Sequence, residues 1–156
     1  MSYKEKIKRT TPSDNDFQNL VRYLDKELAE RDSDEHAFYA QYNKSDSIKH
    51  VVLYYKDDHA VGCGAFKYYE ENTVEIKRMF VLKKFRGKGI AKEILNELES
   101  WAAANNFSEC ILETGKKQPE AIKLYSKCGY EIIPNFGQYE GKENSVCFKK
   151  KLKIEY

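Results

Sequence analysis

The sequence predicts one α/β domain in which a mixed sheet carries helices on its faces, and three observations support this. The chain has 156 residues, the size of a single domain with a real core. Runs of β-branched and aromatic residues bounded by polar turns predict strands. Longer stretches with apolar side chains every three or four positions predict helices between them. The predicted order is one strand, two helices, three strands, a helix, a strand, a helix and two strands.

The first part of the chain predicts the strand and the two helices. Residues 3–10 alternate weakly between apolar and polar side chains, as a strand does. Residues 11–31 carry apolar side chains at helical spacing, and we expect Thr11 to cap this helix with Pro12 at its first position. Residues 34–42 are a candidate for a second, short helix.

The rest of the chain predicts three strands in succession and then helices that alternate with strands. The predicted strands cover residues 48–56, 60–69, 73–82, 109–114, 130–134 and 145–154. One helix follows the loop at residues 86–91. Another covers residues 119–128 and ends at Gly129, a residue that suits the left-handed conformation after a helix. No repeat, linker or low-complexity tract divides the chain, so we expect one domain over residues 1–156.

Composition and charge narrow the functions that we expect. The formal net charge of +2 at pH 7 is too small to indicate a nucleic-acid or membrane partner. No apolar run approaches the roughly 20 residues that cross a bilayer. The first residues lack the apolar stretch of a secretory signal, so we expect a cytoplasmic protein. The four cysteines form no C-x-x-C pair and the three histidines are scattered, so we expect buried, reduced thiols and no metal site.

The segment FRGKGIAKEIL, residues 85–95, places two glycines and two cations directly before an apolar helix. The first amides of a helix have no partner within it, and the helix dipole adds partial positive charge there. Glycine lets the backbone approach a ligand closely, and Arg86 and Lys88 add charge, so the segment predicts a phosphate site. It matches neither the P-loop nor the dinucleotide-binding fingerprint. A plain tight turn is the alternative.

The same segment fits the pattern [RQ]-x-x-G-x-[GA] from Arg86 to Ala91, and it thereby resembles the acetyl-CoA motif of the GNAT superfamily of N-acetyltransferases. The family's next motif, L-Y-x-x-x-G-[FY], is matched by Leu124, Tyr125, Gly129 and Tyr130. The strand predicted before the first motif and the helix predicted after it follow the family's order. The resemblance covers about residues 48–134.

This resemblance implies a mixed, mostly antiparallel sheet of about seven strands, with helices on both faces and a splay between the fourth and fifth strands. It implies acetyl-CoA as the cofactor, with the pantetheine arm between these two strands and the pyrophosphate on the amides of residues 86–91. The implied cofactor-binding residues are Met79, Phe80, Val81, Arg86, Gly87, Lys88, Gly89, Ile90, Ala91, Thr114, Gln118, Ala121 and Tyr125. Many family members carry Asn where this chain has Gln118, which is a departure from the pattern.

Transfer of an acetyl group to an amine needs a base for the ammonium and an acid for the departing thiolate. Glu75 lies eleven residues before Arg86, a spacing similar to that of the glutamate base in the histone-acetylating branch of the family. A carboxylate is a weak base for an amine, so Glu75 would need burial or a water relay. Lys77 would oppose a raised pKa unless a bulge separates the two. The alternative is an ordinary outward-facing glutamate.

Tyr125 matches the tyrosine that many family members use as the general acid. Its phenol could donate a proton to the thiolate, and a merely packed tyrosine is the alternative. Acceptor sites in the family come from the first helices and the last loops. Here the acidic and aromatic candidates for acceptor contact are Glu35, Phe38, Tyr39 and Tyr42. Such a surface would suit a cationic amine, and a solvated helix end with core aromatics is the alternative.

We therefore expect an acetyl-CoA-dependent N-acetyltransferase that acts on the primary amine of a small molecule by direct attack. One alternative is a protein acetyltransferase that modifies a lysine or an N-terminus. The other is a non-catalytic acyl-CoA-binding regulatory module. Because many relatives dimerise, we also expect that a homodimer can form.

Overall fold

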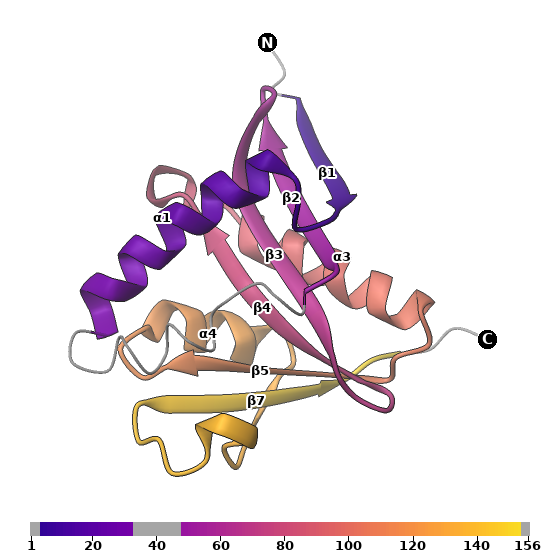
Figure 1. Cartoon of the computed structure of the whole chain (residues 1–156), viewed down its shortest axis with the longest axis vertical. Helices are drawn as coiled ribbons and strands as arrows, with labels where there is room; N and C mark the ends of the chain where they lie inside the picture. Colours follow the sequence, from indigo (N-terminus) through magenta and orange to yellow (C-terminus); the bar gives the residue numbers. More distant parts are fainter. Residues whose placement is uncertain (1–3, 33–47, 154–156) are drawn as a thin grey trace.

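The computed structural model describes residues 4–32 and 48–153, and Figure 1 labels its elements. The strands are β1 (Glu5–Thr10), β2 (His50–Lys56), β3 (His59–Glu70), β4 (Thr73–Val81), β5 (Glu109–Gly115), β6 (Glu131–Ile133) and β7 (Ser145–Lys151). The helices are α1 (Asn15–Asp32), α3 (Ile90–Ala104) and α4 (Pro119–Lys127), with short 3-10 turns η2 (Lys83–Phe85) and η3 (Gly137–Tyr139). The helix predicted at residues 34–42 lies outside the described residues.

The seven described strands form one sheet in the order β1-β2-β3-β4-β5-β7-β6. β4 and β5 pair in parallel, and the other neighbouring pairs are antiparallel. The crossover between the two parallel strands is made by α3, which lies between them in the sequence. The predicted mixed, mostly antiparallel sheet is confirmed.

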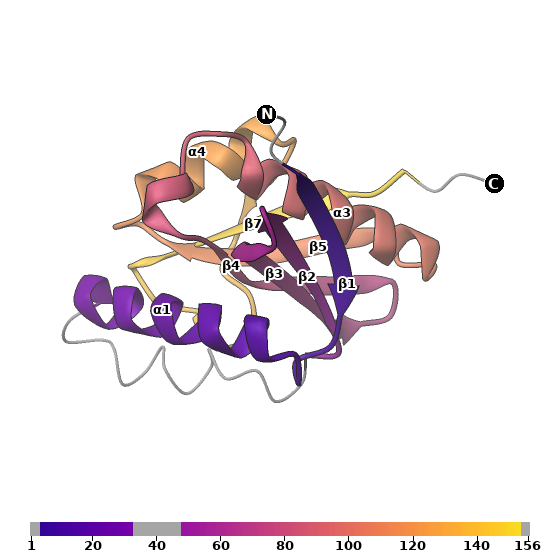
Figure 2. The same ribbon diagram turned by 90° about the horizontal axis from the view of Figure 1, so that it is seen from above.

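Helices cover both faces of this sheet. Figure 2 shows α1 on one side of the sheet and α3 and α4 on the other. The buried side chains between α1 and the sheet include Phe17, Leu20, Leu24, Leu53, Cys63 and Phe80. Those between the sheet and the other two helices include Val74, Ile76, Ile94, Leu98, Leu112 and Phe148. Successive residues of a strand point to opposite faces, so one strand supplies both layers.

The start of α1 differs from its prediction. The helix begins at Asn15, and the cap is Asp14, whose Oδ1 accepts the amide of Asp16 at 2.9 Å. Thr11 instead opens a turn, because its carbonyl oxygen accepts the amide of Asp14 at 3.1 Å. The expected cap at Thr11 and first helical position at Pro12 are therefore wrong.

A bulge interrupts β4 opposite β3. Cys63 pairs with Phe80 and Ala65 pairs with Lys77, so two residues of β4 lie opposite the single residue Gly64. Arg78, one of those two, has a left-handed φ of 60°. The bulge reverses the alternation of side chains along the strand. Phe80 consequently points to the same face as Lys77, although the two are three positions apart.

Gly64 is required by close packing against this bulge. A Cβ built there would lie 2.5 Å from Sδ of Met79 and 2.8 Å from a side-chain carbon of Leu98. We therefore expect Gly64→Ala to lower the free energy of unfolding by about 1–3 kcal/mol, because overpacked cores must shift to admit a methyl group. Chemical denaturation measures this. Gly115→Ala is the matched control, since its Cβ would meet neighbours only at 3.7 Å or more. Equal stability of the two variants would contradict the packing argument.

Three of the four thiols are buried, as predicted: Cys63, Cys110 and Cys147. Burial raises the pKa of Cys63 and of Cys110 to about 12, and that of Cys147 to about 11. The fourth, Cys128, is half-buried at the end of α4. All four thiols are free.

Candidate active site

The parallel strands β4 and β5 separate soon after they begin. Their paired residues are Thr73 with Glu109, Val74 with Cys110 and Glu75 with Ile111. β4 continues to Val81 beyond these pairs, and Figure 1 shows the two strands diverging toward their carboxyl ends. The predicted splay therefore begins just after Glu75. The edge of β4 beyond this point can pair with an added extended chain.

Two cavities lie along the gap between the splayed strands. We call them the loop cavity and the Glu75 cavity. The loop cavity has a volume of about 360 Å³ and lies between the end of β4, the loop before α3, and α4. The predicted cofactor residues that line it are Met79, Phe80, Val81, Arg86, Gly87, Gly89, Ile90, Ala91, Gln118, Ala121 and Tyr125. Two predicted residues do not: Thr114 lines the Glu75 cavity, and the Nζ of Lys88 lies 5.7 Å from the ring centre of Phe85.

The loop before α3 depends on its glycines for backbone conformation. Gly87 and Gly89 have φ values of 78° and 82°, in the left-handed region. Gly89 caps α3 without a side-chain hydrogen bond, and the first amide bonded back to it is that of Glu93. The amides of residues 90–92 therefore have no partner within the helix. Together with the helix dipole they make the loop cavity suited to an anion.

Arg86, which was predicted to add charge to a phosphate site, also has partners within the protein. Its Nε donates to the carbonyl oxygen of Val81 at 2.8 Å. Its terminal nitrogen lies 2.9 and 3.0 Å from the two carboxylate oxygens of Glu27. The guanidinium therefore ties the loop to β4 and to α1 at the wall of the loop cavity.

The Glu75 cavity has a volume of about 120 Å³ and lies on the α1 side of the splay. Its walls come from β4, β5, the start of α4 and the loop around Tyr139. The residues that line both cavities are Leu24, Met79, Gln118, Ala121 and Tyr125. The two cavities therefore adjoin at one place, and Tyr125 lies at it.

Glu75 is buried, with only 2% of its surface exposed, so it is not an outward-facing strand residue. Its Oε1 lies 3.9 Å from Nζ of Lys67 and its Oε2 lies 3.7 Å from Nζ of Lys77. Oε2 has no hydrogen-bond partner among the described residues. The bulge comes after Lys77, so the two residues share a strand face. Burial raises the pKa of Glu75, and the two lysines only partly oppose this.

Tyr125 is also buried, on the inner side of α4. Its ring centre lies 5.8 Å from that of Tyr130 and 5.8 Å from that of Phe148. Burial, followed by the nearby carboxylate of Glu113, raises the pKa of its phenol. A tyrosine that stays protonated can act as a proton donor, and its packed ring fixes the position of the hydroxyl.

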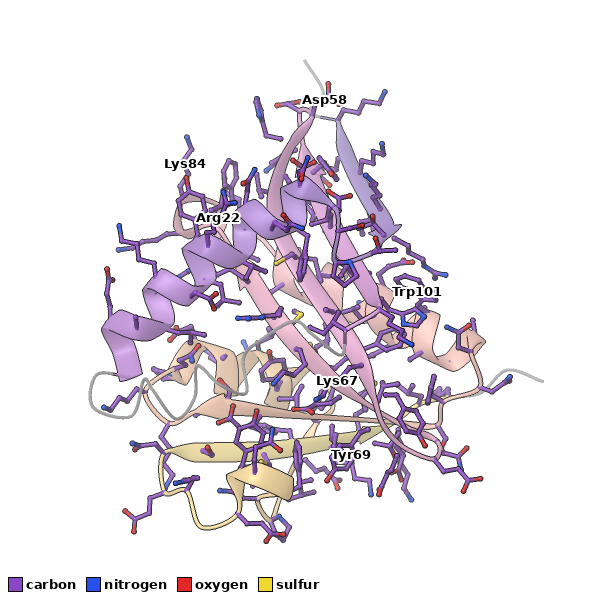
Figure 3. The ribbon with its side chains drawn as sticks, in the orientation of Figure 1. Arg22, Asp58, Lys67, Tyr69, Lys84 and Trp101 are labelled. Carbon is purple, nitrogen blue, oxygen red and sulfur yellow. The ribbon has the colours of Figure 1, made fainter. Side chains whose placement is uncertain are left out.

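Several polar residues in or beside this site were not predicted. They include Lys67, Arg78, Glu113, Lys116, Lys117, Tyr139, Asn144 and Ser145. Lys77 Nζ donates to the hydroxyl of Tyr139 at 3.2 Å, and Ser145 Oγ donates to Glu113 Oε2 at 2.7 Å. Figure 3 shows Lys67 and Tyr69 on the part of β3 toward β5 and β7. The loop that carries Tyr139 reaches the sheet here, since Tyr69 packs against Phe136 at 5.4 Å.

The predicted acceptor residues Glu35, Phe38, Tyr39 and Tyr42 lie outside the described residues. Within residues 4–32 and 48–153, no three His, Cys, Asp or Glu side chains are grouped so that they could hold a metal ion. None of the helices described is both long enough and apolar enough to cross a membrane.

Known proteins resemble this chain in sequence. It is 39% identical over 93 residues to an IAA acetyltransferase of Azospirillum brasilense, a match that covers 59% of this chain and 61% of that protein. It is 41% identical over 75 residues to the N-acetylaspartate synthetase of Homo sapiens, which covers 47% of this chain and 25% of that protein. The matched part of the chain thus spans 61% of the length of the first of these relatives and 25% of the second.

Solved structures resemble it over nearly the whole chain. A Klebsiella pneumoniae structure assigned as an acyl-CoA N-acyltransferase has a TM-score of 0.79 and 28% identity, covering 96% of this chain and 98% of that one. An acetyltransferase of the GNAT family from Elizabethkingia anophelis, solved with acetyl-CoA bound, has a TM-score of 0.69 and 20% identity and covers 95% and 98%.

The family model of the acetyltransferase (GNAT) family matches residues 17–130, which include the glycine loop, the splayed strands and α4. The resemblance read from the two sequence motifs is thereby confirmed, together with the acetyltransferase class and the acetyl-CoA cofactor of the family. This chain belongs to the acetyltransferase (GNAT) family.

Proposed function

We propose that this protein transfers the acetyl group of acetyl-CoA directly to the primary amine of a small molecule. The observation that supports this most is the junction of the two cavities at Tyr125. One cavity adjoins a glycine loop suited to a pyrophosphate, and the other contains a buried carboxylate suited to a base. The relatives named for IAA and for N-acetylaspartate act, by their names, on small molecules, which favours a small acceptor here as well.

The residues present fit acetyl-CoA. The amides of residues 87–91 would hold the pyrophosphate, since both glycines there are left-handed and the first turn of α3 is uncapped by any side chain. The amide of Arg86, which was also predicted to take part, donates to the carbonyl oxygen of Lys83 at 3.3 Å. The free edge of β4 at Met79 to Val81 would hold the pantetheine amides, with Thr114, Gln118 and Ala121 opposite. When bound, acetyl-CoA supplies the activated acetyl group.

Glu75 is the base in this proposal. Its pKa is raised by burial, which brings it closer to that of an amine and makes proton transfer less uphill. Lys67 and Lys77 partly oppose this rise in the pKa of Glu75, because each lies within 4.0 Å of a carboxylate oxygen. The remaining gap in pKa favours a water between Glu75 and the amine.

Tyr125 is the acid. Its phenol holds a proton at the junction of the cavities, where the sulfur would leave. Buried ionisable groups with perturbed pKa values in a cleft are typical of catalytic sites. The pair of Glu75 and Tyr125 therefore favours an enzyme over a non-catalytic acyl-CoA-binding module. The cytoplasmic location, the single domain over residues 1–156 and the homodimer stay predictions.

Calorimetric titration with coenzyme A tests the cofactor site. We expect saturable heat below millimolar concentration. Gly89→Ala is expected to raise the Kd about tenfold, since a Cβ in the left-handed region costs about 1–2 kcal/mol and the loop must shift. Gly141→Ala is the matched control, because Gly141 has a similar φ of 76° but lines neither cavity. Absence of any saturation by the native chain would refute the proposed function.

A further inference from the structure

The Glu75 cavity carries more positive than negative side chains among the described residues. Its cationic lining residues are Lys77, Arg78, Lys116 and Lys117, and its anionic ones are Glu75 and Glu113. Arg78 is compensated from outside this set, because its terminal nitrogen lies 2.6 Å from a carboxylate oxygen of Asp25 on α1. The electrostatic potential in the cavity therefore depends mainly on the carboxylates of Glu75 and Glu113 and on the three lysines of its lining.

The two carboxylates already have partners within the protein. Glu75 lies between Lys67 and Lys77, each less than 4.0 Å from one of its oxygens. Glu113 accepts the hydroxyl of Ser145 at 2.7 Å. An acceptor that carries only positive charge would therefore gain little attraction from these carboxylates, and it would meet the lysines of the same wall as like charges.

Lys116 and Lys117 line the Glu75 cavity from the loop between β5 and α4. Both are exposed, and neither side chain makes an ion pair with any described residue. The backbone beneath them is fixed, since the amide of Lys116 donates to Asn144 at 2.8 Å and that of Gln118 donates to Gly115 at 3.0 Å. Tyr125 lines the same cavity as these two lysines.

We propose that the acceptor is a primary amine that also carries a carboxylate, that is, an amino acid, and that Lys116 and Lys117 bind this carboxylate. This inference rests on the proposed function. The neutral amine nitrogen forms a bond to the acetyl carbon while the carbon–sulfur bond breaks. The proton of the amine passes to Glu75, and the sulfur takes a proton from Tyr125. The carboxylate of the acceptor is unchanged by the reaction and serves only to position it.

Matched pairs of acceptors test this, each pair being an amino acid and its α-amide. The pairs are built on aspartate, glutamate, alanine and phenylalanine, with spermidine as a polycation, and thiol release is measured. For each pair that reacts, we expect kcat/KM to be at least about tenfold higher for the acid, the effect of one charged hydrogen bond. The amine of an α-amide loses its proton more readily, so intrinsic reactivity works against this result.

The double variant Lys116→Gln, Lys117→Gln tests whether these two lysines bind the carboxylate of the acceptor. We expect it to lower kcat/KM for the acid about tenfold and for the amide much less, so that the ratio within a pair approaches one. Lys127→Gln is the control, since Lys127 is exposed on the far end of α4 and lines neither cavity. The Lys127→Gln variant removes one lysine charge without changing any residue that lines the Glu75 cavity.

Two results would overturn the inference while leaving the proposed function intact: amides or spermidine that react as well as the acids, or a double variant that weakens both members of a pair equally. If no amine released thiol although coenzyme A bound, the transfer reaction itself would be wrong. If coenzyme A did not bind, the cofactor site would be wrong. The outcomes are therefore distinguishable in one set of measurements.

Discussion

Replacing Glu75 by glutamine is expected to lower kcat by about 100-fold or more, while the affinity for coenzyme A stays within about twofold, because a positioned base contributes about 10²–10⁴-fold. Glutamine has nearly the same shape as glutamate, so it fills the buried position beside Lys67 and Lys77 without creating a cavity. It has no carboxylate to accept a proton. The loss should therefore appear in kcat rather than in cofactor binding.

The pH dependence separates a base from a residue that merely packs. A base works when deprotonated, so kcat should rise with pH through the pKa of Glu75. Burial raises that pKa against the opposition of Lys77 and Lys67, so the midpoint should lie above the ordinary pKa of a carboxyl group. The rising limb should vanish in Glu75→Gln. Glu109→Gln, which removes a carboxylate paired with Lys149 outside both cavities, should keep both the rate and the profile. A full rate in Glu75→Gln would remove Glu75 from the mechanism.

Tyr125→Phe is expected to lower kcat about tenfold or more with little change in stability. The phenylalanine ring keeps the contacts with Tyr130 and Phe148, and only the hydroxyl is lost. An acid that acts on the leaving sulfur is needed only in the transition state, so KM for acetyl-CoA should change little. Burial raises the pKa of the Tyr125 phenol above its ordinary value of about 10. Loss of the phenol proton should therefore cause no fall in kcat at pH values below about 10.

Tyr130→Phe is the matched control for this experiment. The ring of Tyr130 packs against that of Tyr125, but its hydroxyl donates to Glu99 at 2.8 Å. Tyr130 lines neither cavity. We expect it to lower the free energy of unfolding by about 1 kcal/mol and to leave kcat within about twofold. If both tyrosine variants lowered kcat equally, the effect of Tyr125 would belong to packing and not to acid catalysis.

The elements of this fold could be predicted because they are encoded locally. Alternation in residues 48–56 and 60–69 and helical spacing after the glycine loop appear within a few residues of each position. Because the prediction used only local signals, it also placed the start of α1 at the wrong residue. Thr11 and Asp14 are both good caps, and only the turn between them, together with the bond from Lys8 Nζ to Asp14 at 2.9 Å, favours the second.

The candidate site was predictable as far as its motifs extend. The glycine loop and the L-Y-x-x-x-G-Y segment place the loop cavity, and Glu75 follows from its distance to the loop along the chain. The surroundings of Glu75 were not predictable, because Lys67, Tyr139 and Ser145 come from three separate segments that meet only in the folded sheet. The ion pair between Arg86 and Glu27 could likewise not be predicted, because the two residues are remote in sequence.

The protonated state of the buried cysteines has a practical consequence for every rate measurement suggested above. Aryl disulfide reagents, which report released coenzyme A by colour, react with thiolates and not with thiols. With a pKa of about 12, only about one in 10,000 molecules carries a thiolate at Cys63 or Cys110 at pH 8. Those side chains are also fully shielded from solvent. The native chain can therefore be assayed continuously without first removing its sulfur atoms, and the half-buried Cys128 is the one residue whose background signal needs to be subtracted.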